Sequence, residues 1–164
     1  MRRAIKLLPL LLVLSSGCVV CVAHAAEPQA QYVIVEGMRL SDPRFTPGEA
    51  RPLAENAVCA TKWGKDERHV TLKMKRTVCG LYGETEGCPG RGFEVDHLIS
   101  RELGGADTIA NLFPQPIGQA RLKDRLENRL HREVCAGAIS LHAAQIEIAK
   151  NWWTAFKKRF GEDK

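Results

Sequence analysis

Two adjacent side chains, Asp96 and His97, have the residue types of a hydrolytic site, and an amide, Asn111, follows fourteen residues after the histidine. A neutral imidazole has an unperturbed pKa of about 6.5 and can take a proton from water. A carboxylate can hold a divalent cation against a phosphate group. These residue types therefore predict metal-assisted hydrolysis of a phosphodiester bond.

The surrounding segment has the pattern of a β-hairpin, in which two apolar, β-prone runs flank a glycine pair that marks a chain reversal. The runs are Phe93, Val95, Leu98 and Ile99 before Gly104-Gly105, and Ile109, Leu112 and Phe113 after it, with Pro114 and Pro116 ending the second strand. Neighbouring residues on a strand point to opposite faces. We expect a bulge or the strand end to re-aim Asp96 or His97 into a shared pocket.

The chain resembles the HNH endonuclease family. The motif consists of Asp96-His97, Gly104-Gly105 and Asn111-Leu112-x-Pro114, followed by a polar helix. A wider pattern is similar to small secreted bacterial proteins of HNH type, and comprises Lys123-Asp124, Leu126-Glu127-Asn128, Leu130-His131 and Val134-Cys135. The similarity covers residues 59 to 160. It implies an α+β fold of the ββα-metal type, with a hairpin and a helix around one divalent ion, Mg²⁺ or Mn²⁺, and with flanking helices. It also implies a nucleic-acid substrate, DNA above all.

Site roles follow from the same resemblance. His97 is expected to act as the general base that activates water, and Asp96 as the metal ligand. Asn111 is expected to tie down the loop and fix the tautomer of the imidazole. The alternatives are structural: a histidine satisfied by a backbone carbonyl, an aspartate that caps a turn, and an Asx-turn residue closing the hairpin.

The third metal position of the family motif falls on Ala120, which cannot be a ligand. The following helix offers four polar residues on one stripe: Asp124, Glu127, Asn128 and His131. Asp124 is the preferred ligand, because it lies nearest the helix start and is a hard oxygen donor suited to magnesium or manganese. The same stripe is also what any amphipathic helix shows. Lys123 or Arg121 is expected to contact the substrate phosphate.

The N-terminus has the pattern of an export signal. Three basic residues precede the apolar run at 7–14, and Ala23-His24-Ala25 forms a cleavage site, which predicts a signal peptide over residues 1–25. We expect a periplasmic or secreted protein without stable membrane insertion; a lipoprotein anchored at Cys18 is the alternative. Removing residues 1–25 lowers the formal net charge from +5 to +2. A basic stretch at residues 62–76 could bind phosphates, or it could be an ordinary solvated face.

Four cysteines remain after the signal, Cys59, Cys79, Cys88 and Cys135, and an even count in an exported chain predicts two disulfides with three possible connectivities. We prefer Cys79 with Cys88, which closes a glycine-rich loop, and Cys59 with Cys135. The resembling family has counterparts of the latter two cysteines, which supports their pairing. Structural zinc is the rival interpretation, although no C-x-x-C motif occurs.

Residues 26–58 are predicted to form an extended, proline-rich segment, with an edge strand at 32–35 and a connection at 41–53, ahead of an HNH-like domain at 59–164. Helices are predicted at 71–82 with Thr71 as N-cap, at 119–136, and at 141–160 with Ser140 as N-cap. The second helix has the apolar stripe Leu122, Leu126, Leu130 and Val134; the third has Ala144, Ile148, Trp152, Ala155 and Phe156, with Trp153 partly exposed.

The leading hypothesis is thus an exported, disulfide-stabilised, metal-dependent endonuclease. The alternative is a noncatalytic binding protein that retains a degenerate fold of this type, which Ala120 and the modest mature charge favour. A secreted toxin or envelope factor with another target is a weaker third interpretation. The sequence identifies no protein partner.

Overall fold

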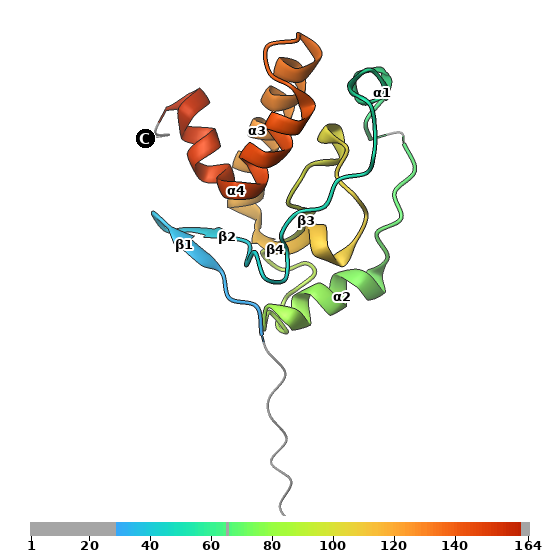
Figure 1. Cartoon of the computed structure of the whole chain (residues 1–164). Helices are drawn as coiled ribbons and strands as arrows, with labels where there is room; N and C mark the ends of the chain where they lie inside the picture. The colour runs from blue at the N-terminus through green and yellow to red at the C-terminus, as the bar shows by residue number, and fades with distance from the viewer. Residues whose placement is uncertain (1–28, 65, 162–164) are drawn as a thin grey trace, which may run out of the picture.

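The computed structural model describes residues 29–64 and 66–161, so the predicted signal peptide lies outside the described part of the chain. Within that part the architecture is α+β, as predicted, with two small antiparallel hairpins and four α-helices (Figure 1). The strands are β1 (Val33–Val35), β2 (Met38–Leu40), β3 (Phe93–His97) and β4 (Leu112–Pro116). The helices are α1 (Glu55–Ala60), α2 (Leu72–Leu81), α3 (Ile117–Cys135) and α4 (Leu141–Phe160). Among the described residues, none of the helices is long and apolar enough to cross a bilayer.

β3 and β4 form the central hairpin and pair antiparallel over their full length. The prediction that Pro114 and Pro116 end the second strand is confirmed for Pro116, the last residue of β4, and wrong for Pro114, which lies within the strand. Just beyond the ladder, the amide of Leu98 donates to the carbonyl of Asn111. In an antiparallel ladder, hydrogen-bonded residue pairs alternate with non-hydrogen-bonded pairs. Counted from the Leu98–Asn111 pair, Pro114 and Pro116 both fall in non-hydrogen-bonded pairs. The ladder therefore needs no N–H group from either proline.

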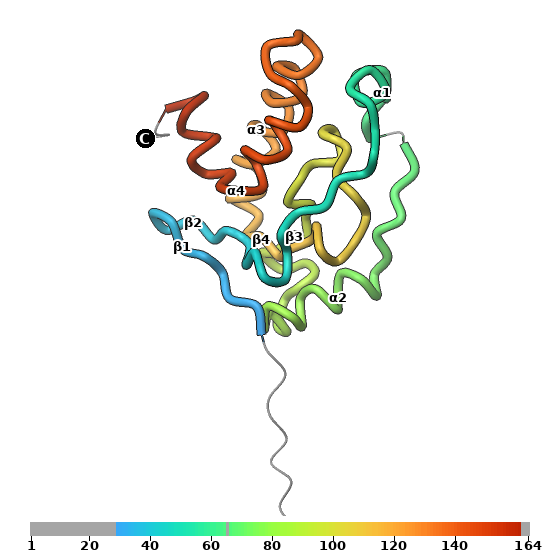
Figure 2. Tube along the Cα trace, in the orientation of Figure 1, coloured from blue at the N-terminus to red at the C-terminus, as the bar shows by residue number. Residues whose placement is uncertain are grey.

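The loop of the hairpin, residues 98–111, contains two short 3-10 helices, Arg101–Leu103 and Ile109–Asn111. The predicted connection at 41–53 lies against this loop (Figure 2). Three backbone hydrogen bonds join the two segments: Gly48 N to Ala110 O, Arg51 N to Gly104 O, and Ala106 N to Glu49 O. Gly105 lies where these two segments meet. A Cβ atom on this residue would be 1.8 Å from the carbonyl oxygen of Ile99. Only glycine fits there, and the N-terminal segment holds the loop in position.

α3 follows β4 directly and packs on α4. Eight of the nine apolar residues predicted for the stripes of these two helices are buried: Leu126, Leu130, Val134, Ala144, Ile148, Trp152, Ala155 and Phe156. The exception is Leu122, which is only partly buried, because Lys123 takes the inward position instead. Trp153 is buried and not partly exposed as predicted; its Nε1 donates to Glu36 at 2.9 Å.

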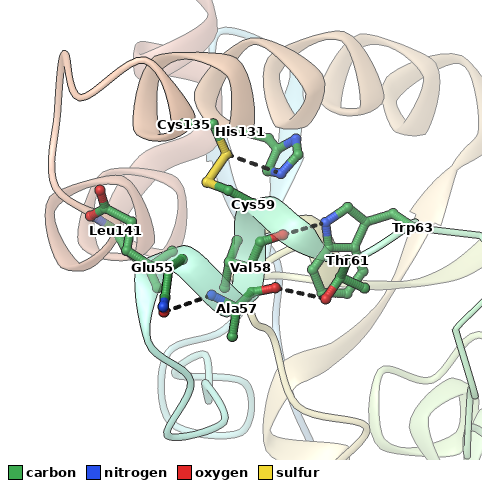
Figure 3. The surroundings of a disulfide bond; sticks show 10 residues. Glu55, Ala57, Val58, Cys59, Thr61, Trp63, His131, Cys135 and Leu141 are labelled. Atoms are coloured by element: carbon green, nitrogen blue, oxygen red, sulfur yellow. Dashed lines mark hydrogen bonds between the residues drawn. A yellow bond between two sulfur atoms is a disulfide. The ribbon is translucent and has the colours of Figure 1, made fainter.

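Both preferred disulfides, Cys59–Cys135 and Cys79–Cys88, are present. The first joins the end of α3 to α1, a short helix that we did not predict from the sequence (Figure 3). The second closes a loop that follows α2, whose predicted N-cap, Thr71, accepts a hydrogen bond from the amide of Met74.

Candidate active site

Asp96 and His97 line one open pocket of ≈ 220 Å³, whose walls come from β3, the hairpin loop, α3 and the segment between α1 and α2. β3 ends at His97, so the two neighbouring side chains reach a common pocket at the strand end. Six carboxylates line this pocket against two guanidinium groups; they are Asp66, Glu94, Asp96, Glu102, Asp124 and Glu127 against Arg68 and Arg101. This excess of negative charge attracts cations and repels free phosphate.

His97 is buried, with 3% of its surface exposed, and is held by Asp107, which we did not single out from the sequence. His97 Nε2 lies 2.7 Å from Asp107 Oδ1. Burial raises the pKa of Asp107, but hydrogen bonds from the His69 amide and from His97 outweigh it and hold that pKa below its usual value. Asp107 is therefore ionised and can only accept a hydrogen bond.

The protonation state of His97 follows from these contacts. Burial lowers the pKa of His97, and this effect exceeds the opposing effects of Asp107 and Asp96. The imidazole is therefore neutral near pH 7. Because Asp107 only accepts, Nε2 carries the single proton, and Nδ1 carries the lone pair. A neutral histidine with a fixed tautomer can serve as a general base.

Asn111 is fully buried and ties the hairpin loop together. Its Nδ2 donates to the carbonyls of Ile99 and Ala106 at 3.0 Å each, and its Oδ1 accepts from the amides of Ile99 and Glu49. The expected role in the loop is thus visible in the contacts. Asn111 does not contact the imidazole as expected, because its amide group makes all of these hydrogen bonds to the backbone. The tautomer of His97 is fixed by Asp107 instead.

Lys123 is fully buried beneath the pocket and bridges two carboxylates, which corrects the expectation that it contacts substrate. Its Nζ lies 2.7 Å from Asp96 Oδ2 and also bonds to Glu127. Burial alone would lower the pKa of Lys123, but the two carboxylates raise it well above its usual value, so the ammonium stays charged. The same ammonium outweighs burial at Asp96 and lowers the pKa of that carboxyl.

The carboxylate oxygens of Asp96, Asp124 and Glu127 lie within 4.8 Å of one another. Mg²⁺ takes oxygen ligands at about 2.1 Å in octahedral geometry, so adjacent ligands lie about 3.0 Å apart and opposite ligands about 4.2 Å apart, and the three side chains would have to draw closer together to share one ion. When all three carboxyl groups are ionised, they and the Lys123 ammonium carry a net charge of −2, which one divalent cation would neutralise. Burial, followed by repulsion from Asp96, raises the pKa of Asp124, and burial raises that of Glu127. The donor set therefore fits a single hard divalent ion.

The other predicted helix residues lie outside the pocket. Ala120 is buried in the core, and Arg121 is exposed on α3. The side chain of Asn128 donates to the backbone carbonyl of Asp124. His131 lies at the other end of the helix, with its Nε2 3.4 Å from Cys135 Sγ (Figure 3). Of the stripe, only Asp124 and Glu127 meet Asp96.

Three further carboxylates of the pocket, Asp66, Glu94 and Glu102, were not predicted from the sequence. A signal existed for Glu94, because it lies two residues before Asp96 on a strand and so on the same face. Burial, then repulsion from Asp96 and Asp124, raises its pKa. Burial also raises the pKa of Glu102, whose Oε2 is buried without a hydrogen-bond partner among the described residues. No local signal identifies Asp107, because its contact with His97 depends on the path of the loop.

No protein-family model, curated protein or solved structure matches this chain. Function is therefore inferred from the geometry of the pocket. That geometry combines a neutral imidazole of fixed tautomer with a group of carboxylates that suits a cation.

Proposed function

We propose that the protein is a metal-dependent phosphodiesterase of HNH type that cleaves nucleic acid, with DNA as the expected substrate. One observation carries the proposal: His97, neutral and held by Asp107, opens onto the same pocket as the Asp96, Asp124 and Glu127 carboxylates. Hydrolysis of a phosphodiester requires a base for water and positive charge at the phosphate. The two sides of this pocket can supply both.

In this proposal His97 accepts a proton from the attacking water at Nδ1, because Nε2 donates to Asp107. The negative charge of Asp107 then stabilises the imidazolium that forms. Asp107 is itself oriented by the backbone amide of His69 at 2.6 Å. Asn111 keeps the loop that carries Asp107 in register with β3.

Asp96, Asp124 and Glu127 would hold the divalent ion, Mg²⁺ or Mn²⁺. When bound, such an ion supplies Lewis acidity toward a phosphate oxygen and stabilises the leaving oxygen. Lys123 keeps Asp96 ionised and oriented from beneath the pocket. Arg68 and Arg101, at the pocket wall, are better situated than Arg121 to contact the substrate phosphates.

The same proposal includes the fold type and the compartment. The order β3, β4, α3 around the carboxylates supports the ββα-metal arrangement implied by the family resemblance. The N-terminal signal pattern and the two disulfides support export to the periplasm or the medium.

A noncatalytic protein with the same fold is the second candidate, and Lys123 favours it. Its ammonium already contacts two of the three carboxylates, so an internal cation compensates part of the charge that a metal would neutralise. In that case the pocket would be a structural ion-pair network.

Cleavage of plasmid and of single-stranded DNA by the oxidised mature chain in Mg²⁺ or Mn²⁺ tests the proposal. His97→Ala is expected to lower the cleavage rate by about 10²- to 10⁴-fold. His142→Ala is the matched control, because His142 is exposed on α4 and distant from the pocket lining. No cleavage by the wild type, or equal cleavage by His97→Ala, would refute the enzyme hypothesis.

A further inference from the structure

A second and larger pocket, of ≈ 630 Å³, adjoins the candidate active site. The two share Trp63 and Asp66 in their walls, and Asp107 of the second pocket is the residue that holds His97 of the first. We call the second cavity the Trp63 pocket. Its volume is typical of small-molecule sites. A polymer lying over His97 would therefore extend directly into it.

The indole of Trp63 is held rigidly in the wall of this pocket. Its Nε1 donates to the carbonyl of Val58 at 3.1 Å, and its edge meets the ring of His131 at 6.4 Å between centroids. Val58 belongs to α1, which the Cys59–Cys135 disulfide attaches to α3 (Figure 3). A flat aromatic surface is thus presented in one fixed orientation.

Arg51 adds a second flat group to the same wall. Its guanidinium lies 5.8 Å from the centroid of the Trp63 ring. Two of its nitrogens, Nε and Nη2, are buried and have no hydrogen-bond partner among the described residues. Buried donors in proteins nearly always have an acceptor. The pocket that Arg51 lines is where an acceptor on a ligand can approach.

The charge around the pocket selects the kind of ligand. Asp66, Glu67 and Asp107 contribute carboxylates to its lining, and Leu53, Ala57 and Ala106 contribute apolar surface. With three carboxylates against the one guanidinium of Arg51, the lining disfavours a free phosphate. A neutral, planar heteroaromatic ring with carbonyl oxygens would instead stack on the Trp63 and Arg51 groups and accept hydrogen bonds from the guanidinium.

We propose that the Trp63 pocket binds an unpaired nucleobase next to the phosphodiester bond at His97, so that the protein prefers single-stranded nucleic acid. This inference builds on the proposed nuclease function. A base can enter such a pocket only when it has left the duplex stack, because its faces are covered in the double helix. Trp63 and Arg51 would then bind any unpaired base by stacking on its ring, so the preference for single strands would depend little on base sequence.

The test measures binding without turnover, in full-length mature His97→Ala protein. The probes are a short fluorescein-labelled oligothymidylate and an abasic oligonucleotide of the same length and charge, compared by fluorescence anisotropy. Unlabelled oligothymidylate gives a second signal, the quenching of tryptophan emission. Trp152 and Trp153 are 0% and 7% exposed, so a base that stacks in this pocket would quench Trp63 above all.

We expect oligothymidylate to bind more tightly than the abasic probe and to quench the emission. Adding Trp63→Leu should weaken oligothymidylate binding by about 5- to 150-fold and leave abasic binding unchanged. Arg51→Met, a milder change, should weaken it in the same direction. Equal binding of both probes, or unchanged binding by a folded Trp63→Leu variant, would overturn the inference.

Cleavage of single- and double-stranded substrates by the wild type, compared with the binding results, separates this inference from the proposed function. Cleavage that depends on His97 but shows no base-dependent binding would overturn the inference and leave the nuclease function standing. Base-dependent binding at Trp63 without cleavage by the wild type would support the pocket and overturn the catalytic function.

Discussion

The two sides of the candidate active site differ in how completely their polar groups are satisfied. On the histidine side, Asn111 uses its whole amide on the loop backbone, and His97 and Asp107 bond each other. On the carboxylate side, a cluster of acids shares a single buried ammonium, Lys123. The carboxyl groups other than Asp96 have raised pKa values, namely Glu94, Glu102, Asp124 and Glu127.

The proposed function accounts for this difference. A preorganised base needs fixed neighbours, since reorientation during the reaction would raise the barrier. A cation site needs the opposite, because carboxylates that repel each other in the free protein bind a divalent ion favourably. Variants that act on one side only can test this contrast.

The largest effect is expected for Lys123→Met. This change removes one partner of a buried ion-pair network and leaves Asp96 and Glu127 uncompensated, so the free energy of unfolding should fall by about 3–5 kcal/mol without metal. Saturating Mg²⁺ or Mn²⁺ should restore much of the loss, because the ion would replace the missing positive charge. Urea unfolding with and without metal measures both. A destabilised variant that no divalent ion rescues would indicate a purely structural network.

Asp107→Asn tests the histidine side, and its effect should appear in catalysis. Loss of the ionised partner removes control of the tautomer, so kcat should fall by about 10²-fold or more. Asp107 raises the pKa of His97, so its removal should also shift the acidic limb of the pH–rate profile to lower pH. Metal affinity should stay unchanged. A shift toward higher pH would contradict the assignment.

Asp124→Asn should have the smallest effect on stability, and of the opposite sign. A carboxyl group with a raised pKa binds its proton more tightly in the folded state, so the ionised form destabilises the fold above the pKa of the unfolded chain. Neutral asparagine should therefore raise the metal-free unfolding free energy at pH 7, by no more than about 0.5 kcal/mol because Asp124 is solvent-exposed. The gain should disappear below about pH 4. Calorimetric titration should show weaker Mn²⁺ binding; unchanged binding would exclude Asp124 as a ligand.

Local patterns predicted the segments well where one face of an element is buried. Thr71 and Ser140 begin the predicted helices, and the α4 stripe is buried as its spacing indicated. The proline error in β4 arose because proline was treated as a strand terminator, whereas its effect depends on which residues donate across the ladder. The inward turn of Lys123 was missed because a charged residue is normally assigned to the solvent face, and only its two buried partners make the interior favourable.

The sequence alone determined the hairpin with its Asp96-His97 pair and the three main helices, because periodicity and caps are local properties. The cysteine count left three disulfide connectivities open, and the family resemblance supported the observed pairing of Cys59 with Cys135. The tertiary structure alone decided that Asp107 holds His97, that Lys123 compensates Asp96 and Glu127, and that Trp63 and Arg51 form one wall. Apart from the i, i+4 pair Lys123–Glu127 within α3, each of these contacts joins residues from separate segments of the chain, whose distances depend on how the loops and the N-terminal segment fold back on the hairpin.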